Sequence, residues 1–284
     1  MDGLIKFGAQ ILDFACSGMN ITAHSRTVPL VTNLDVPEII SALNPGYWRV
    51  HHFNLIDSTQ TSLVAALSSG RAAAGDVYLA EFQSAGKGRL DRRFESAASD
   101  SVLVSLAISP KHQPQCRWGW IPLVAGVAAA SAIMESTGIS ATLKWPNDVM
   151  INDEKAGGII AEKIDEVIVL GIGINCMQSE NNLPAPGATS LSIHSDSLVN
   201  RNAVVISLLN AVARFVKAWD EKPLPVENKY RQLSATLEQR VKALLPDGSE
   251  IVEKAIAISS DGALVLANGR ELVAGDVTHL RADK

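Results

Sequence analysis

A segment rich in glycine and basic residues is the first place in this chain where the residue types could bind an anionic ligand. It runs from Gln83 to Phe94 and reads Gln-Ser-Ala-Gly-Lys-Gly-Arg-Leu-Asp-Arg-Arg-Phe. Glycine lets the backbone approach a ligand closely, and cations neutralise phosphate or carboxylate charge. The segment matches neither a P-loop nor a dinucleotide-binding fingerprint. It suits a nucleotide or an acyl phosphate, with a solvated basic surface loop as the alternative.

Three further motifs put polar residues at strand ends or at breaks between strands. In Lys144-Trp-Pro-Asn-Asp148, an amide and a carboxylate stand side by side and could serve Mg²⁺ and phosphate oxygens. Lys155 leads into a strand that carries two glycines, and Gly171-Ile-Gly-Ile-Asn175 is an apolar strand that ends in an amide. Taken singly, each motif has an ordinary structural explanation, such as an Asx-stabilised turn, an exposed turn lysine or a capping asparagine.

The elements that must position these motifs alternate between strands and helices. Asp57-Ser58-Thr59 stands in helix-capping position between a short strand and a helix that ends at Gly70. Apolar residues at helical spacing predict further helices from Trp120 to Gly138 and from Asn202 to Trp219. Strands are expected at 51–56, 77–82, 102–108, 142–145, 149–151, 158–162 and 167–174. The last four form an antiparallel meander, so the pattern favours an α+β fold.

Turn signals divide the chain into three parts. Residues 1–45 end at Asn44-Pro45-Gly46 and lack the two or three clear helices of a helix-turn-helix domain, so we expect an N-terminal appendage that does not bind DNA. Residues 46–237 hold the motifs and should form the catalytic domain. Residues 238–284 consist of short β-rich runs separated by Pro-Asp-Gly, Ser-Asp-Gly and Asn-Gly turns, which predicts a small β-barrel.

Composition narrows the class of protein. The formal net charge is −5, which argues against a generally basic surface for nucleic acid. Cys16, Cys116 and Cys176 are widely spaced and indicate neither a disulfide framework nor a zinc site, so we expect a reducing, cytoplasmic location. The apolar stretch Ile11–Cys16 is too short to span a bilayer, and we predict no membrane segment.

Together, the order and spacing of the motifs resemble the catalytic domain of biotin–protein ligases. That family's Asp-Ser-Thr, Lys-Trp-Pro-Asn-Asp and Gly-x-Gly-x-Asn stretches match 57–59, 144–148 and 171–175, and its Lys-x-x-Gly-Ile strand resembles 155–159. Its Gly-Arg-Gly-Arg loop resembles 86–89, although Lys87 stands where arginine is usual and Asp91 where glycine is usual. The C-terminal residues resemble the family's SH3-like barrel.

The resemblance implies a mixed, largely antiparallel sheet with packed helices, similar to class II synthetases, followed by the SH3-like barrel. It implies an enzyme that forms biotinyl-5′-AMP from biotin and ATP with Mg²⁺. The enzyme then transfers biotin to a lysine of a biotin carboxyl carrier domain. The implied form is monofunctional, without a DNA-binding domain, and either a monomer or a weak homodimer.

The resemblance also assigns site residues by position. Biotin would be bound by Ser58, Thr59, Gln60, Gln83, Lys87, Gly88, Arg89 and Lys155. ATP or the adenylate would contact Arg92, Phe94, Asn147 and Asn175, and Mg²⁺ would be held by Asn147 and Asp148. The catalytic roles fall to Lys155, Arg89 and Asp148: Lys155 would lie between the biotin carboxylate and the α-phosphate, and Asp148 would orient the acceptor amine.

Two alternatives stay open at this point, one a related ligase and the other a protein of another class. A lipoate or octanoyl ligase of similar fold should lack the Lys-Trp-Pro-Asn-Asp and Gly-Arg-Gly-Arg combination and should have a more apolar acyl pocket. A non-catalytic biotin sensor acting as a repressor would need a DNA-binding domain, for which residues 1–45 give little support.

Overall fold

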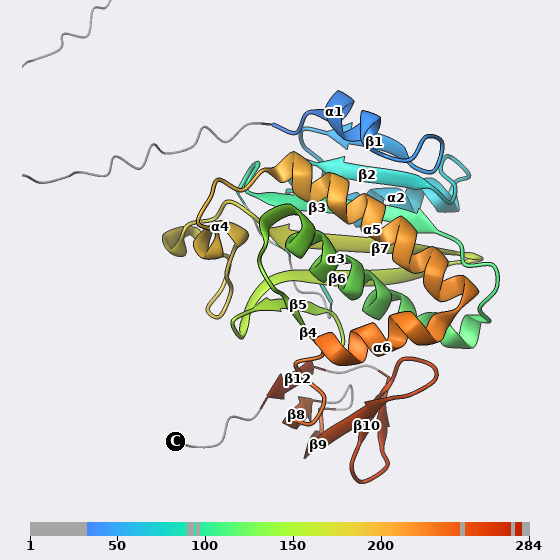
Figure 1. Ribbon diagram of the computed structural model, residues 1–284. Helices are drawn as coiled ribbons and strands as arrows, with labels where there is room; N and C mark the ends of the chain where they lie inside the picture. The colour runs from blue at the N-terminus through green and yellow to red at the C-terminus, as the bar shows by residue number, and fades with distance from the viewer. Residues whose placement is uncertain (1–32, 90–93, 95–96, 245–247, 274–275, 280–284) are drawn as a thin grey trace, which may run out of the picture. The chain divides into compact units, whose positions relative to one another are not determined.

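A mixed seven-stranded sheet is the centre of the computed structural model, which describes residues 33–89, 94, 97–244, 248–273 and 276–279 (Figure 1). In spatial order its strands are β1 (Arg49–Phe53), β2 (Asp76–Ala80), β3 (Ser101–Ile108), β7 (Val167–Asn175), β6 (Glu154–Ile164), β5 (Asp148–Ile151) and β4 (Thr142–Lys144). Strands β1 and β2 are parallel, and each of the other neighbouring pairs in this sheet is antiparallel. The predicted α+β class with a largely antiparallel sheet is confirmed.

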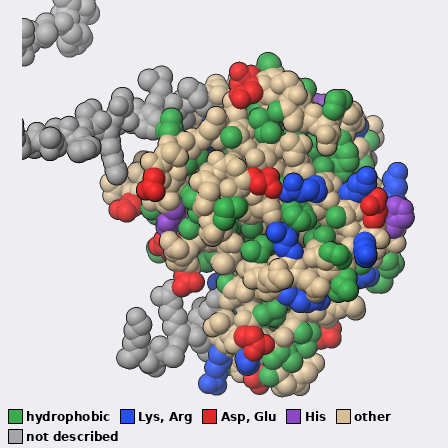
Figure 2. All heavy atoms as spheres, viewed as in Figure 1, with side chains coloured by type: hydrophobic (Ala, Val, Ile, Leu, Met, Phe, Trp, Pro, Cys, Tyr) green, Lys and Arg blue, Asp and Glu red, His purple; other side chains and the backbone are tan. Residues whose placement is uncertain are grey.

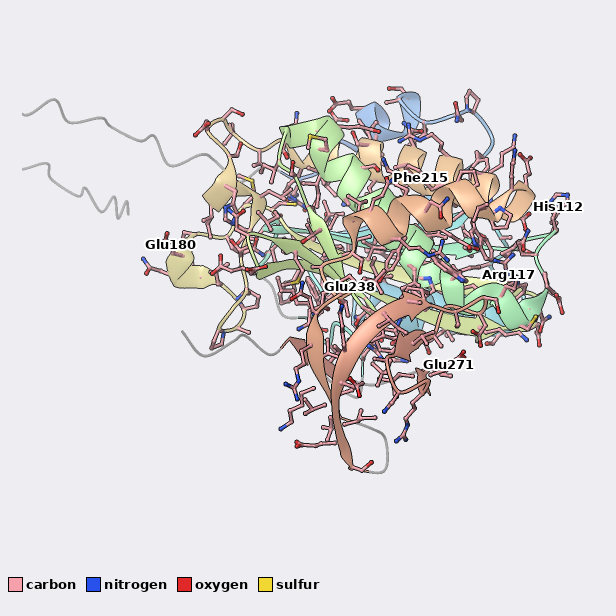
Figure 3. The ribbon with its side chains drawn as sticks, turned by 60° about the horizontal axis from the view of Figure 1, so that its bottom comes forward. His112, Arg117, Glu180, Phe215, Glu238 and Glu271 are labelled. Carbon is pink, nitrogen blue, oxygen red and sulfur yellow. The ribbon has the colours of Figure 1, made fainter. Side chains whose placement is uncertain are left out.

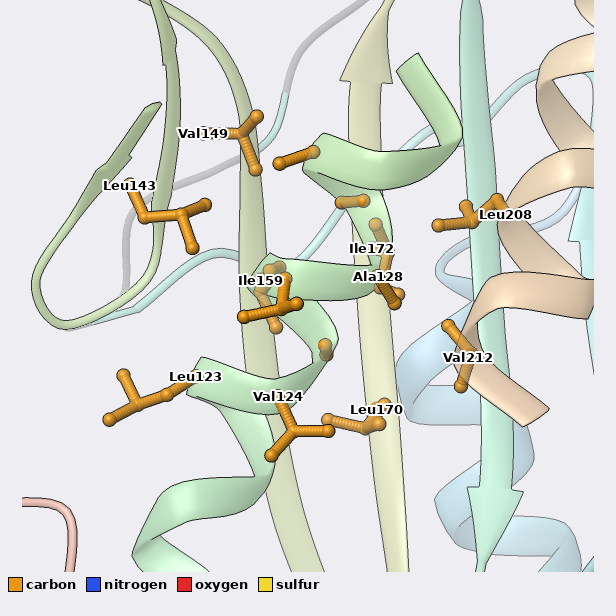
Figure 4. Close-up of a cluster of buried hydrophobic side chains, with 14 of the residues drawn as sticks. Leu123, Val124, Ala128, Leu143, Val149, Ile159, Leu170, Ile172, Leu208 and Val212 are labelled. Atoms are coloured by element: carbon orange, nitrogen blue, oxygen red, sulfur yellow. The ribbon is translucent and has the colours of Figure 1, made fainter. Parts of the chain in front are cut away.

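Helices cover both faces of this sheet. Helix α2 (Thr59–Ser68) packs on one face, where its Leu63 meets Ala107 and Val169. Helices α3 (Ile121–Thr137) and α5 (Arg201–Glu221) lie on the other face and enclose the main core (Figure 4). The remaining helical elements are α1 (Val36–Ser41), η1 (Gln115–Trp120), η2 (Glu180–Asn182), α4 (Leu191–His194) and α6 (Pro223–Leu233). Residues of one strand alternate between the two cores, as the period of a β-strand requires.

Helices α3 and α5 are apolar because they are core helices. The segments Gln115–Thr137 and Arg201–Glu221 are long and apolar enough to cross a membrane, but 67% and 50% of their most apolar windows are buried inside the protein. The alanines of α3 bring it close to α5, and Gly138 ends α3 in the left-handed conformation at φ 74°.

Acidic and basic side chains are interspersed with hydrophobic ones on the face in Figure 2, in keeping with the small net charge.

The segment before β1 packs more closely than expected of an appendage. The side chain of Asp35 caps α1 by accepting from the backbone N–H of Glu38 at 3.0 Å, and Leu34, Ile39 and Leu43 are buried. Residues 33–45 thus belong to the same compact unit as the sheet, where α1 packs against α5. Residues 1–32 lie outside the described residues.

A second, five-stranded sheet follows α6. Its strands, in spatial order, are β11 (Glu271–Leu272), β10 (Leu264–Leu266), β9 (Glu250–Ile258), β8 (Arg240–Leu244) and β12 (Asp276–His279). All its neighbouring pairs are antiparallel, and Gly262 and Gly269 take positive φ angles in the turns that the sequence predicted. The β-rich character expected of this region is therefore present.

Side chains of the first sheet domain hold one turn of the second sheet. The indole N–H of Trp145 donates to the carbonyl of Gly262 at 3.2 Å, and that of Trp120 donates to Ser259 at 3.0 Å. Arg117, labelled in Figure 3, donates to the carbonyl of Ser260 at 3.1 Å and pairs with Glu227 of α6. The 259–262 turn therefore lies against Trp145 of the Lys144–Asp148 segment.

Candidate active site

A cavity of about 140 Å³ opens on the seven-stranded sheet, where all four sequence motifs meet. It is lined by the predicted site residues Ser58, Thr59, Gln60, Gln83, Lys87, Gly88, Arg89, Phe94, Asn147, Asp148 and Lys155. Glycines of β6 and β7 and apolar side chains of β3 complete the wall. Of the predicted site residues, Arg92 lies outside the described residues, and Asn175 does not line this cavity.

The first turn of α2 forms one wall. Ser58 is the N-cap, and its hydroxyl accepts from the backbone N–H of Thr61. Asp57 accepts from the backbone N–H of Ser58 at 2.6 Å and from the hydroxyl of Ser62 at 2.8 Å. These two hydrogen bonds hold the pKa of the Asp57 carboxyl below its ordinary value, and the one from the Ser58 backbone has the larger effect. The predicted strand-to-helix junction is thus a rigid polar corner at the cavity.

The side-chain amide of Gln83 has a fixed orientation. Its Oε1 accepts from the backbone N–H of Thr59 at 2.7 Å and from the Thr59 hydroxyl at 3.0 Å. A backbone N–H can only donate, so the atom that faces it must be the oxygen. The hydroxyl of Ser105 lies 2.8 Å from Thr59 Oγ1 and must be the donor, because the Thr59 proton goes to Gln83. Gln83 therefore keeps its NH₂ group available as a donor.

The side-chain amide of Gln60 has the opposite orientation. Its Nε2 donates to the carbonyl of Val169 at 3.1 Å and to Glu162 Oε1 at 3.0 Å, and both partners can only accept. Gln60 is 2% exposed, and its Oε1 is buried with no hydrogen-bond partner among the described residues. A buried acceptor without a partner costs free energy, so this oxygen is suited to an N–H of a ligand.

The cavity thus offers a donor from Gln83 and an acceptor from Gln60. A ligand whose carbonyl lies next to an N–H, as in a urea, a lactam or a primary amide, satisfies both at once. A ligand with only apolar atoms at this end would leave the Gln60 oxygen unpaired. Recognition by paired amides is therefore specific for a small polar group.

Two glycines of β7 make room for this arrangement. A Cβ on Gly171 would lie 2.7 Å from Gln60 Oε1, and a Cβ on Gly173 would lie 2.5 Å from the Phe94 ring. The backbone N–H of Phe94 donates to the carbonyl of Gly86 at 2.9 Å, which brings the end of the glycine-rich segment back over its start. A side chain at either β7 position would therefore displace Gln60 or Phe94, which both line the cavity.

Positive charge marks the other end of the cavity. Lys155 Nζ lies 2.5 Å from Asp148 Oδ1, and Arg89 Nη1 donates to Asn147 Oδ1 at 3.0 Å. The Asn147 amide also donates to the carbonyl of Ile159 at 3.0 Å, which fixes its orientation. An ammonium and a guanidinium that converge on one cavity suit a ligand with a carboxylate or a phosphate.

Only part of the predicted Mg²⁺ site suits a metal ion. The Asn147 oxygen faces the Arg89 guanidinium, so it is a poor ligand for a second cation. Asp148 offers one carboxylate, and within the described residues no group of three or more His, Cys, Asp or Glu side chains could hold a metal. Mg²⁺ often takes one or two protein carboxylates and completes its shell with substrate phosphates. Oδ1 of Asp148 pairs with Lys155, so the other carboxylate oxygen is the one that suits this role.

Asn175 does not line the cavity but contacts the segment beside Lys155. It ends β7, and its amide donates to the carbonyl of Thr189 at 2.9 Å. The backbone of Lys155 accepts from Thr189 N–H at 2.9 Å and donates to the carbonyl of Gly187 at 2.8 Å. Asn175 therefore holds the segment that pairs with the backbone of Lys155.

Ser105 lines the cavity, and Glu162 contacts Gln60 and Lys87 in its wall, although neither was among the predicted site residues. Ser105 is a buried serine in an otherwise apolar strand, and that contrast was the available signal. Glu162 looks like an ordinary polar residue on the outer part of β6.

Similarity to known proteins decides the family. A family model described as the biotin/lipoate A/B protein ligase family matches residues 52–179. A biotin–acetyl-CoA-carboxylase ligase of Mycobacterium tuberculosis is 34% identical over 267 residues, which cover 92% of this chain and 100% of that protein. The chain belongs to the biotin–protein ligase family. The resemblance found from the motifs is confirmed.

Other members of the biotin–protein ligase family extend the match. The bifunctional ligase/repressor BirA of Bacillus subtilis is 29% identical over 230 residues, covering 78% of this chain and 70% of BirA. The structure of the Aquifex aeolicus biotin protein ligase in complex with biotin and ATP superposes with a TM-score of 0.70. It is 27% identical and covers 82% of this chain and 99% of its own. The predicted α+β fold, with a mixed sheet and packed helices, is therefore confirmed.

Proposed function

We propose that this chain is an ATP-dependent biotin–protein ligase. It joins biotin to AMP with release of pyrophosphate, and it then transfers biotin to a lysine of a biotin carboxyl carrier domain. The observation that carries the proposal is the pair of oppositely oriented amides, Gln83 and Gln60, beside Lys155 and Arg89. Biotin has a ureido group at one end and a carboxylate at the other. The Gln83 and Gln60 amides suit the ureido group, and Lys155 and Arg89 suit the carboxylate.

The first half-reaction brings two anions together. An oxygen of the biotin carboxylate attacks the α-phosphorus of ATP, the bond from that phosphorus to the oxygen bridging the α- and β-phosphates breaks, and pyrophosphate leaves. No side-chain nucleophile is needed, so the residues act by positioning and by neutralising charge. We assign Lys155 to the carboxylate and α-phosphate, and Arg89 to the phosphate side. Asp148 would hold the Mg²⁺ that accompanies ATP, and Mg²⁺ supplies further charge neutralisation when bound.

The second half-reaction forms the amide. The acceptor amine attacks the acyl carbon of biotinyl-5′-AMP, AMP leaves, and the amine gives up a proton. Asp148 is the carboxylate at the charged end of the cavity that can orient the amine. Phe94, whose backbone N–H donates to Gly86, lies in the wall that would shield the mixed anhydride from water. We propose Phe94 and Asn147 as contacts of the nucleotide, with Asn175 acting through the 187–189 segment.

A lipoate or octanoyl ligase is the second candidate, because the family description covers lipoate as well as biotin. The amide pair argues against it. The apolar end of a lipoyl or octanoyl chain carries no N–H, so the Gln60 oxygen would stay buried without a partner.

The remaining proposals concern the whole protein. We propose that the five-stranded C-terminal sheet is the family's SH3-like barrel, that the enzyme is cytoplasmic, and that it is a monomer or a weak homodimer. We keep the proposed division into a catalytic domain that ends near residue 237 and a C-terminal domain of residues 238–284. On the net charge of −5 and the sequence of residues 1–45, we propose a ligase that does not act on DNA.

Intact-mass spectrometry of a carrier domain tests the proposal. The full chain, incubated with biotin, MgATP and the carrier, should add one biotinyl group to the carrier. A carrier whose acceptor lysine is replaced by arginine is the matched control and should stay unmodified. Lipoate and octanoate in place of biotin should give no adduct. Absence of the biotin adduct with folded enzyme at saturating substrates would overturn the assignment.

A further inference from the structure

Glu162 contacts two parts of the cavity wall at the same time. Its Oε1 accepts from Gln60 Nε2 at 3.0 Å, and its Oε2 lies 2.8 Å from Lys87 Nζ. Gln60 belongs to α2, Lys87 to the glycine-rich segment, and Glu162 to β6. One carboxylate therefore connects three elements that are far apart in the sequence.

The contact with Gln60 decides which atom of that amide faces a ligand. The NH₂ group has two protons, of which one goes to the carbonyl of Val169 and the other to Glu162. A rotated amide would set its oxygen against two acceptors, which is unfavourable. With Glu162 in place, the oxygen stays beside Gly171, which lines the cavity, and it has no partner within the described residues.

The contact with Lys87 contributes less. Both side chains of that pair are partly exposed, at 45% for Lys87 and 32% for Glu162, and exposed ion pairs stabilise proteins little. A similar pair, Lys242 and Glu250, has the same 2.8 Å separation in the C-terminal sheet, remote from the cavity. The pair with Lys87 alone gives no reason to expect an effect on ligand binding.

We propose that Glu162 is a positioning residue for recognition of the ureido group, acting through Gln60. This assignment rests on the proposed function, since it takes biotin as the ligand. Glu162 does not touch the ligand. It fixes the Gln60 amide so that its oxygen accepts a ureido N–H, while Gln83 donates to the ureido carbonyl.

Calorimetric titration of the full chain with biotin, without ATP, tests this assignment. Glu162→Ala should raise the biotin Kd about tenfold, or ~1.4 kcal/mol, because the Gln60 amide keeps one of its two anchors. Glu162→Gln should stay within about threefold of wild type, since its amide oxygen can still accept from Gln60. Glu250→Ala is the matched control and should leave the biotin Kd unchanged. Thermal unfolding of each variant checks that it is folded.

A double-mutant cycle separates positioning from a general structural effect. In a Gln60→Ala background, Glu162→Ala should have no further effect on the biotin Kd, because the residue through which it acts is gone. Binding of ATP alone should be the same in all variants.

Three results would overturn the assignment. The first is a biotin Kd for Glu162→Ala within about twofold of wild type. The second is equal weakening of binding with and without Gln60. The third is Glu162→Gln binding as weakly as Glu162→Ala, which would mean that the charge next to Lys87 matters instead. If wild-type protein bound no biotin, the proposed function itself would fail; normal wild-type binding with any of these three results would remove the role of Glu162 alone.

Discussion

Replacing Gln83 by glutamate reverses one polar group in the cavity and changes almost nothing in its shape. In Gln83→Glu, one carboxylate oxygen can keep both hydrogen bonds from Thr59, at 2.7 and 3.0 Å. The other oxygen takes the place of the NH₂ group. A donor thereby becomes an acceptor at the position where we expect the ureido carbonyl of biotin.

The expected cost falls on binding and not on folding. The new carboxylate lies at the N-terminus of α2, where the helix dipole favours negative charge, so the free energy of unfolding should change by less than about 1 kcal/mol. Bound biotin would lose a hydrogen bond and would face an acceptor with its own carbonyl. Together these effects should cost about 3 kcal/mol, or roughly a 150-fold increase in the biotin Kd.

Titration calorimetry with biotin, together with thermal unfolding, measures both quantities. Gln232→Glu, at an exposed position of α6, is a control with the same change of charge and should bind biotin like wild type. If Gln83→Glu bound biotin within about threefold of wild type while the protein stayed folded, Gln83 would not be the donor, and the amide-pair argument would be wrong.

Three other substitutions test other parts of the site and the fold. Lys155→Ala should slow biotin-dependent pyrophosphate exchange by about a hundredfold, since a charge contact worth ~3 kcal/mol is lost. Near-native exchange would mean that Lys155 only pairs with Asp148 and has no catalytic role. Arg89→Gly should release biotinyl-5′-AMP faster and label bystander albumin on a streptavidin blot, and a variant that is merely slower would refute a role in retention. Burial raises the pKa of the Asp220 carboxyl, but hydrogen bonds from the backbone N–H groups of 111–113 and from His112 outweigh it and keep the pKa below its ordinary value. Asp220→Asn should therefore cost about 2 kcal/mol of stability at neutral pH. Denaturant titrations should show this difference shrinking as the pH falls below roughly 3.9, where the carboxyl becomes protonated. A difference that does not depend on pH would contradict the role of the carboxylate.

The sheet could be predicted from the sequence because its strands carry strong local signals. The meander that ends in β7 has β-branched runs and turn residues, and its strands lie close to the expected ranges. Helix α6 was not expected, because Pro223 and Pro225 look like loop residues, whereas Pro223 in fact begins the helix. Helix α1 is only six residues long, and its burial depends on α5, which is remote in the sequence. Helices α6 and α1 therefore depend on tertiary packing more than on local sequence signals.

The site was predictable as a set of residues but not as a geometry. Spacing and resemblance named the residues that line the cavity, and 11 of the 13 predicted ones do so. The orientation of the amides of Gln60 and Gln83 depends on partners more than twenty residues away, which spacing cannot reveal. Likewise, the Asn175 amide donates to the carbonyl of Thr189, a contact that forms only when the chain folds back along Lys155, whereas its Oδ1 has no partner within the described residues.

The central claim is that this cavity activates biotin with ATP, and biotin-dependent ATP–pyrophosphate exchange tests it most directly. The assay needs only the full chain, MgATP, labelled pyrophosphate and biotin, so it does not depend on knowing the acceptor. Label should enter ATP only when biotin is present, and lipoate or octanoate should not replace it. Absence of exchange with biotin, or equal exchange with octanoate, would contradict the reading of Gln83 and Gln60 as a ureido site.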